Sequence, residues 1–245
     1  MSAEVLFTLD VGNSGLGLGT WRGGQLEVTR RIDPQDTARD LVAAWAASPR
    51  AEVVAISVST DRLRGLLGAL GEQAARVRLL RDPPLELADP RLAGTAGADR
   101  LANALALAPG PGIAVDAGTA VTVDLVDGRG RYLGGFIAPG PAVAARGLAA
   151  GTAQLPQLSG EPVPIEPGGE THAALSAGLW GLAVGGVDRL VEAALERLSD
   201  EASAAAPLLV ATGAWGRHWA RDSRHVGITC DDTLVHRGMR TWARS

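Results

Sequence analysis

The sequence contains no lysine, so all 23 residues counted as Lys or Arg are arginines. This absence excludes the lysine of a P-loop, the lysine of a protein-kinase active site and any mechanism through a lysine Schiff base. The formal net charge of -4 also argues against a general nucleic-acid-binding protein. We therefore expect no nucleic-acid partner.

Cysteine is almost absent as well, since Cys230 is the single example. One cysteine excludes an intramolecular disulfide and a cysteine metal cluster. The first residues lack the basic and apolar regions of a signal peptide. The longest uncharged run, about residues 171–187, is broken by His172 and several glycines, so we expect it not to span a membrane. These features predict a cytoplasmic protein without a membrane partner.

Residues 113–140 form the stretch around which the chain is organised. An apolar run ends at Asp116, a turn with Gly118 and Thr119 follows, and two further apolar runs are joined by a turn at 127–130. Short apolar runs joined by glycine-containing turns favour antiparallel hairpins. A carboxylate beside a glycine and a hydroxyl suits phosphate chemistry, because glycine lets the backbone approach an anion and the carboxylate can hold a cation.

The same plan occurs at the start of the chain, where an apolar run ends at Asp10 and Gly12, Asn13 and Ser14 form the turn. Repetition of strand, turn and hairpin predicts two similar halves, although Asp-x-Gly alone is a common turn. The sequence Pro-Gly-Pro-Gly at 109–112 is the candidate boundary. We therefore expect domains at 1–108 and 109–245.

Between these hairpins the pattern alternates strands with helices, which is typical of an α/β fold with parallel pairing. Asp33 is the expected cap of one helix, and Thr60 of the next. The expected strands are 53–59, 77–80, 207–213 and 225–230. The expected helices begin near residues 34, 60, 98, 141, 171, 215 and 233.

Several polar and aromatic residues allow two interpretations each. Asp99, just after Gly97, is a candidate general base, and Arg100 beside it is a candidate partner for a carboxylate or phosphate. The alternative is that Asp99 is a helix cap and Arg100 a surface residue, and spacing alone slightly favours this alternative. Thr171 is a further candidate cap. Trp215 and Trp219 lie one helical turn apart, where they either flank a nucleotide base or, as we favour, pack in the core or on the surface.

The motifs together resemble one family. Asp10-Val11-Gly12-Asn13-Ser14, Gly97-Ala98-Asp99-Arg100, Asp116-Ala117-Gly118-Thr119 and Gly134 to Gly140 occur in the order seen in type III pantothenate kinases. Thr152 to Pro156 and Thr171 extend the similarity over nearly the whole chain. The resemblance implies the fold of the acetate kinase, sugar kinase, Hsp70 and actin superfamily, which has two ribonuclease H-like lobes with mixed β-sheets flanked by helices.

The resemblance also implies a function: phosphorylation of the terminal hydroxyl of pantothenate by ATP, the first step of coenzyme A synthesis. By this analogy Asp99 is the catalytic base, and the pantothenate site contains Gly97, Ala98, Asp99, Arg100 and Thr171, the last possibly from a second subunit. The implied ATP-binding residues are Asp10, Val11, Gly12, Asn13, Ser14, Gly15, Leu16, Gly17 and Thr119.

The family further implies three cofactor and partner expectations. Asp116 is expected to hold a monovalent cation, potassium or ammonium, and Asp10 to orient the Mg²⁺ that accompanies ATP, directly or through water. With no lysine present, such cations and backbone amides must neutralise the phosphates. A homodimer is expected.

The sequence also departs from the family pattern. Ser14 replaces a threonine, residues 15–19 lack the usual polar side chains, Gly213 is followed by Ala214 instead of a second glycine, and a tyrosine ahead of Gly97 is missing. Two alternatives therefore stand beside the kinase: a non-catalytic nucleotide-binding or transcription-accessory relative, and a kinase for another small alcohol. Retention of Asp10, Asp99 and Asp116 together favours the pantothenate kinase.

Overall fold

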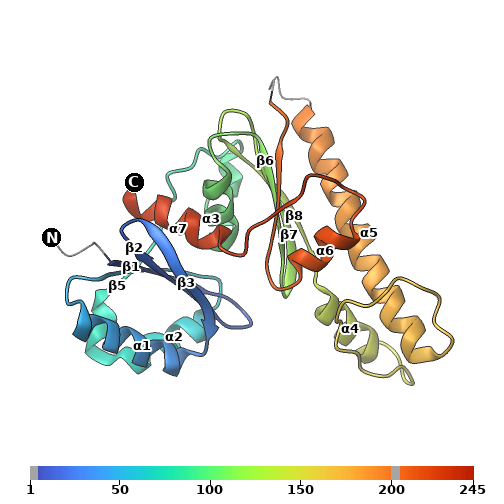
Figure 1. Ribbon diagram of the computed structural model, residues 1–245, viewed down its shortest axis with the longest axis horizontal. Helices are drawn as coiled ribbons and strands as arrows, with labels where there is room; N and C mark the ends of the chain where they lie inside the picture. The colour runs from blue at the N-terminus through green and yellow to red at the C-terminus, as the bar shows by residue number, and fades with distance from the viewer. Residues whose placement is uncertain (1–4, 200–204) are drawn as a thin grey trace. The chain divides into compact units, whose positions relative to one another are not determined.

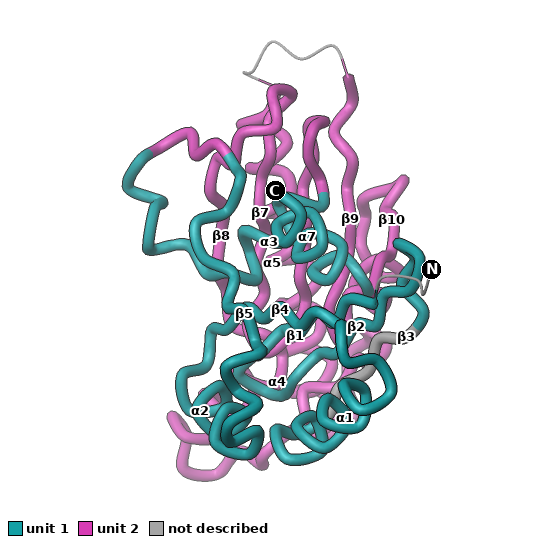
Figure 2. Tube along the Cα trace, turned by 90° about the vertical axis from the view of Figure 1, so that its left-hand side faces the viewer, with its two compact units in different colours: residues 1–85, 90–106, 233–245 teal, residues 86–89, 107–232 magenta. Residues whose placement is uncertain are grey.

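The computed structural model describes residues 5–199 and 205–245 (Figure 1). The chain divides into two compact units, which Figure 2 colours separately. Unit 1 comprises residues 1–85, 90–106 and 233–245, and unit 2 comprises residues 86–89 and 107–232. The chain therefore returns to unit 1 at its C-terminal end.

Unit 1 contains one five-stranded sheet with the order β3-β2-β1-β4-β5. Its strands are β1 (Val5–Val11), β2 (Leu16–Arg22), β3 (Gln25–Ile32), β4 (Glu52–Ser57) and β5 (Val77–Leu79). Its helices are α1 (Pro34–Ala47), α2 (Thr60–Leu70), α3 (Ala98–Leu107) and α7 (Leu234–Arg244), with short 3-10 helices η1 (Gly71–Arg76) and η2 (Pro90–Leu92). β1 pairs antiparallel with β2 and parallel with β4, so the sheet is mixed.

The two faces of β1 serve different purposes. Phe7, Leu9 and Val11 point to one face, where they form a core with residues of α1 and α2 such as Leu41 and Leu66. Successive residues of a strand alternate between faces, so Thr8 and Asp10 point to the other face, against which α7 packs. The alternation therefore places Asp10 away from the apolar core.

Local sequence signals explain the helix starts in unit 1. Asp33 caps α1 as predicted, because its carboxylate accepts hydrogen bonds from the backbone N–H groups of Gln35 and Asp36. The cap predicted for α2 is wrong by one residue: Thr60 is the first helical residue and Ser59 occupies the cap position. The hydroxyl of Ser57 instead accepts the Ser59 N–H, so the polar residue that orders this helix start lies before it.

Unit 2 contains a second five-stranded sheet, ordered β10-β9-β6-β7-β8. Its strands are β6 (Gly112–Ala117), β7 (Ala120–Val126), β8 (Tyr132–Pro139), β9 (Leu208–Thr212) and β10 (Thr229–Cys230), and its helices are α4 (Pro141–Ala150), α5 (Thr171–Ser199) and α6 (Gly216–Asp222). β6 pairs antiparallel with β7 and parallel with β9. Reversed, this order is β8-β7-β6-β9-β10, in which β6 takes the central place that β1 has in the unit 1 order β3-β2-β1-β4-β5. The two sheets therefore have the same strand order.

The long helix α5 covers the unit 2 sheet (Figure 1). By length and composition it is apolar enough to cross a bilayer. Trp180, Val184, Val187 and Val191 are nevertheless buried in one core with residues of β6 and β7. Core helices of soluble proteins pass the same test of length and composition.

The paired sheets confirm the predicted α/β class with mixed sheets flanked by helices. The chain passes from unit 1 to unit 2 between residues 106 and 107, close to the predicted boundary after residue 108. The compact units differ from the predicted domains, 1–108 and 109–245, in that residues 233–245 pack with unit 1. Gly238 shows how close this packing is, because a Cβ there would overlap the backbone of Ala102.

Candidate functional site

The first predicted phosphate-binding element is the turn between β1 and β2. The backbone N–H of Gly12 donates to the carbonyl oxygen of Gly15 over 3.0 Å, which closes the turn. Asn13 and Ser14 are exposed at its tip. A Cβ at Gly15 would meet no atom within 4 Å, so the turn opens into free space on that side. Such an exposed, glycine-flanked turn gives an anion direct access to the backbone.

Asp10 precedes this turn and pairs with Gly17 of β2. A Cβ at Gly17 would lie 3.2 Å from Nε2 of His236 and 3.6 Å from the Cβ of Asp10. The imidazole of His236, on α7, therefore lies against the same glycine as Asp10. Its Nδ1 is 2.9 Å from the hydroxyl oxygen of Thr8. The glycines of β2 thus make room for a buried histidine that the sequence pattern did not single out.

Asp99 lies in the first turn of α3, at the same end of the unit 1 sheet. Its Oδ1 accepts a hydrogen bond from the backbone N–H of Arg100 over 2.8 Å. Gly97 lies close to both groups, because a Cβ there would be 2.6 Å from this carboxylate oxygen and 3.6 Å from Cγ1 of Val58. The N–H of Val58 donates to the carbonyl oxygen of Val11. Val11 directly precedes the turn at residues 12–15, which we call the phosphate turn.

The electrostatics of Asp99 suit a proton acceptor. Burial raises the pKa of the Asp99 carboxyl above its ordinary value, while the hydrogen bond from the Arg100 N–H and the Arg100 charge oppose that rise. A raised pKa makes the ionised carboxylate a stronger base. Asp99 does not occupy the cap position, since α3 begins at Ala98 and the carbonyl oxygen of Gly97 accepts the N–H of Leu101.

Arg62 is a further residue at the phosphate turn. It lies in the first turn of α2, and its Nε donates to the carbonyl oxygen of Asn13 over 3.1 Å. The sequence analysis did not identify Arg62. Its partner Asn13 lies 49 residues away in the sequence, so no local pattern points to this contact.

The second predicted phosphate-binding element is the turn between β6 and β7 in unit 2. Asp116 pairs with Thr122 of β7 and with Thr212 of β9, and is partly buried. Thr119 is exposed beyond it, and its carbonyl oxygen accepts the N–H of Gly140 over 3.0 Å. The turn therefore repeats, in unit 2, the position of Asp10 and its turn in unit 1.

The connection from β9 to α6 closes over the Asp116 turn. Gly213 has a positive φ of 86°, and a Cβ there would lie 2.5 Å from Oδ1 of Asp116. The indole N–H of Trp215 donates to the carbonyl oxygen of Gly118 over 3.0 Å, and its backbone N–H donates to Ala117. Trp215 thus holds the turn in place.

The tryptophans confirm the packing interpretation that the sequence favoured. Trp215 is only 8% exposed and Trp219 is fully buried. Trp215 packs edge-on against Trp180, with ring centroids 5.5 Å apart, and the indole of Trp219 donates to Asp188. Both rings belong to the core of unit 2.

Thr171 is the first residue of α5 and is exposed. The interpretation of Thr171 as the helix cap is wrong. Glu170 caps the helix instead, because its carboxylate accepts the N–H groups of His172 and Ala173 over 3.0 and 2.7 Å. These hydrogen bonds lower the pKa of the Glu170 carboxyl. The hydroxyl of Thr171 is therefore not needed to order the helix start.

Among the described residues, no group of three or more His, Cys, Asp or Glu side chains is arranged to hold a metal ion. Single carboxylates at the ends of strands, Asp10 and Asp116, are the available donors. Mg²⁺ in kinase sites is commonly held through one or two carboxylates together with substrate phosphates. Each of these carboxylates, Asp10 in unit 1 and Asp116 in unit 2, by itself fits a cation that arrives with a phosphate substrate.

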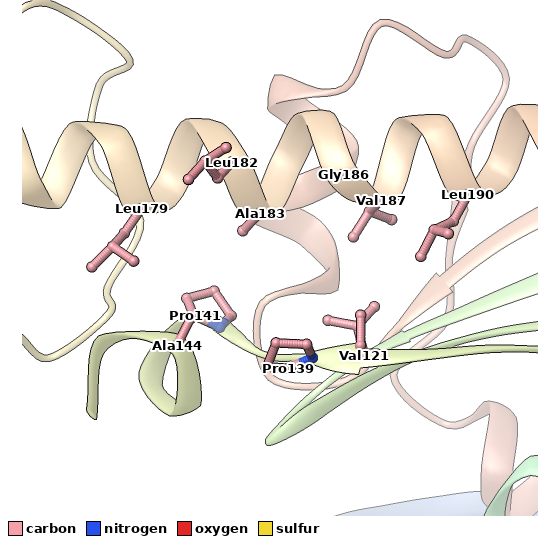
Figure 3. Close-up of a pocket in the computed structure, with 11 residues that line it drawn as sticks. Val121, Pro139, Pro141, Ala144, Leu179, Leu182, Ala183, Gly186, Val187 and Leu190 are labelled. Atoms are coloured by element: carbon pink, nitrogen blue, oxygen red, sulfur yellow. The ribbon is translucent and has the colours of Figure 1, made fainter. Parts of the chain in front are cut away.

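Unit 2 also contains an apolar cavity of about 310 Å³, between α5 and the ends of β7, β8 and α4. Figure 3 shows that its walls are mainly aliphatic side chains. The lining residues from α5 include Leu179, Leu182, Val187 and Leu190. A wall without charged groups does not suit a triphosphate.

Comparisons with known proteins agree on one family. Residues 6–193 match the family of type III pantothenate kinases. A type III pantothenate kinase of Thermus thermophilus is 38% identical over 229 residues, which cover 85% of this chain and 87% of the relative. One of Frankia alni is 33% identical over 222 residues, covering 82% of this chain and 86% of the relative.

Solved structures share the fold. A Campylobacter jejuni protein assigned to the Baf family of transcriptional activators has a TM-score of 0.61 at 22% identity, with 97% of each chain covered. A Sinorhizobium meliloti protein assigned as a 2-dehydro-3-deoxygalactonokinase has a TM-score of 0.55 at 17% identity, with 98% of each chain covered. With the two mixed sheets of equal strand order, these similarities confirm the predicted actin-like ATPase fold.

Proposed function

Because this chain belongs to the type III pantothenate kinase family, we propose that it transfers the γ-phosphoryl group of ATP to the terminal hydroxyl of pantothenate, the first step of coenzyme A synthesis. The observation that supports this function best is Asp99. Its carboxylate has a raised pKa and lies in the first turn of α3. Gly97, two residues before Asp99, lies against Val58. The N–H of Val58 donates to the carbonyl oxygen of Val11, where the turn between β1 and β2 begins. A binding protein has little use for a base at that place.

In the proposed reaction Asp99 accepts the proton of the pantothenate hydroxyl. The hydroxyl oxygen forms a bond to the γ-phosphorus as the bond between that phosphorus and the bridging oxygen breaks, and ADP leaves. Phosphoryl transfer depends mainly on positioning and charge neutralisation, so a single positioned base suffices for the proton. Gly97, Ala98 and Arg100 are the proposed pantothenate-binding residues, and Thr171 is a further proposed contact, contributed by a second subunit.

Residues 10–17 are the proposed binding residues for the ATP phosphates, and Thr119 is a further proposed ATP-binding residue. A kinase of this family uses Mg²⁺ with ATP, and Asp10 is the proposed residue that orients it. Asp116 is the proposed holder of a monovalent cation, because its Oδ1 and the carbonyl oxygen of Ala117 lie on the same side, 2.5 and 2.6 Å from the place of a Cβ at Gly213. Bound cations supply charge neutralisation that a lysine provides in other kinases.

The activity test is direct. Purified protein is incubated with ATP, MgCl₂, KCl and pantothenate, and both ADP and phosphorylated pantothenate are measured. We expect stoichiometric formation of the two products, and a lower rate when sodium replaces potassium. Nucleotide binding without turnover of pantothenate contradicts the proposal and favours the non-catalytic relative. Turnover of another small alcohol in place of pantothenate retains the kinase but changes its substrate.

The proposed assembly is a homodimer in the cytoplasm, where ATP is available. Apolar side chains on the surface of unit 2 support a second copy as the partner. Leu182 of α5 is 77% exposed and Ile137 of β8 is 66% exposed. Burying large exposed aliphatic side chains is a main source of association energy.

A further inference from the structure

Arg62 contacts the turn between β1 and β2, residues 12–15, which is the proposed phosphate-binding turn of unit 1. Its Nε donates to the carbonyl oxygen of Asn13, at the exposed tip of the turn between β1 and β2. A guanidinium carries several N–H donors in a fixed plane. One donor is therefore engaged with the turn, and the group is held next to the place where a phosphate would sit.

Helix stability does not account for Arg62. It lies in the first turn of α2, where a positive charge opposes the helix dipole. Its neighbour Asp61 is paired with Arg64 over 3.1 Å. Within residues 5–199 and 205–245, no carboxylate lies within ion-pair distance of Arg62. By contrast Arg39, in the first half of α1, pairs with Asp36.

The turn itself needs an additional positive group. The N–H of Gly12 already donates to Gly15 inside the turn, so it is not free for a phosphate. The chain has no lysine to supply the charge. An arginine fixed to Asn13 meets this need, because a planar guanidinium binds two phosphate oxygens at once.

We propose that Arg62 is a phosphate-binding residue, whose guanidinium, oriented by the carbonyl oxygen of Asn13, binds oxygens of the ATP triphosphate at the Gly12–Gly15 turn. This inference rests on the proposed use of that turn for ATP. In this proposal Arg62 neutralises part of the negative charge of the ATP phosphates, together with the cations and backbone amides.

The test measures ATP binding by calorimetry with MgCl₂ and without pantothenate. Arg62→Gln is compared with Arg64→Gln, a matched variant on the same helix whose arginine is exposed and paired with Asp61. We expect Arg62→Gln to raise the Kd for ATP by about tenfold or more, as loss of a hydrogen bond to a charged group does. Arg64→Gln changes the Kd by less than about twofold, because exposed pairs contribute little.

The salt dependence of ATP binding distinguishes a direct contact between Arg62 and the phosphates from an indirect effect of Arg62 on the conformation of the turn. A direct charge contact makes ATP affinity fall more steeply with ionic strength in the wild type than in Arg62→Gln, whereas Arg64→Gln keeps the wild-type slope. Arg62→Ala removes the same charge with a residue that favours helix, so it replaces the Gln variant if that variant fails to fold. Equal affinity and equal slope in the Arg62 and Arg64 variants overturn the inference.

The same samples distinguish this inference from the proposed function. Wild-type protein that binds ATP but does not turn over pantothenate contradicts the kinase, while the comparison of Arg62 with Arg64 still decides the inference. Wild-type turnover combined with unchanged ATP binding in Arg62→Gln overturns the inference alone. Absence of ATP binding by the wild type overturns both.

Discussion

At the scale of single residues, Asp99 is the proposed general base, and its burial affects both its basicity and the stability of the fold. Burial disfavours the charged form of a carboxyl and so raises its pKa, as it does here. The folded protein then binds the proton of Asp99 more tightly than the unfolded chain does. Ionised Asp99 at neutral pH consequently lowers the stability of the fold instead of raising it. This is the expected sign for a functional residue and the opposite of that for a helix cap.

The first prediction follows from the destabilising effect of ionised Asp99 on the fold. Asp99→Asn is expected to lower kcat by about 10²–10⁴-fold, the usual share of a general base, and to leave the Kd for ATP nearly unchanged. The melting temperature stays equal or rises, because the cost of ionising a buried carboxyl is removed. Asp36→Asn, an exposed acid in the first turn of α1, is the control and keeps full activity. Loss of folding in Asp99→Asn would instead show that this carboxylate has a structural role.

The second prediction concerns pH. A base acts only when ionised, so wild-type kcat/KM falls as the pH decreases through the pKa of Asp99 in the free enzyme. Because burial raises that pKa from 3.8, the acid limb of the profile lies at higher pH than for an unperturbed aspartate. A profile of kcat/KM against pH checks this. An acid limb at the ordinary aspartate pKa contradicts the role of Asp99.

The sequence predicted individual residues unevenly. Asp33 was predicted as a cap because its carboxylate reaches N–H groups two and three residues onward, which is a local rule. Thr171 was misread because the side chain one residue earlier, Glu170, reaches the same donors. Arg62 and His236 were not found, since each contacts residues far away in the sequence, Asn13 and Thr8. Residue type and spacing carry no signal for such contacts.

At the scale of elements, the Asp116 turn depends on the connection that follows β9. The turn was predicted from its own residues, but its support was not. Gly213 has a positive φ and no room for a Cβ beside Asp116, while Trp215 binds two carbonyl oxygens of the turn. Parallel pairing of β6 with β9 brings these segments together. Pairing between distant strands has no local signature, so this support is visible only in the folded chain.

The third prediction separates the contact of Gly213 with Asp116 from the backbone strain that any alanine at a positive φ causes. Gly213→Ala and Gly227→Ala both place a side chain at positive φ, but only the first meets atoms within 4 Å. Each is expected to lose ~1–2 kcal/mol of unfolding free energy from backbone strain, with a larger loss for Gly213→Ala. Only Gly213→Ala displaces Asp116, and it alone raises the KCl concentration for half-maximal activity. Urea unfolding and a potassium titration measure the two effects. Equal potassium responses in the two variants would remove the link between Gly213 and the cation.

At the scale of the whole chain, the repeated strand plan predicted two similar halves, and both sheets have the same strand order. A repeat is readable because each copy follows the same local pattern of strand, turn and hairpin. The place of α7 was not readable, because its packing in unit 1 joins the two ends of the chain. Amphipathic periodicity identifies a helix but not the sheet that it covers.

The last prediction concerns assembly. Leu182 on α5 is 77% exposed and lines the apolar cavity of unit 2. If a second copy covers this surface, Leu182→Glu places an unpaired charge in the contact, which strongly disfavours association. We expect the wild type to elute as a dimer and Leu182→Glu as a monomer in size-exclusion chromatography with light scattering. Val226→Glu, at an apolar residue that is 91% exposed, is the control and remains dimeric. A monomeric wild type would contradict the proposed homodimer. A Leu182→Glu variant that stays dimeric would show that this surface is not the dimer contact, because the glutamate would then remain in contact with water.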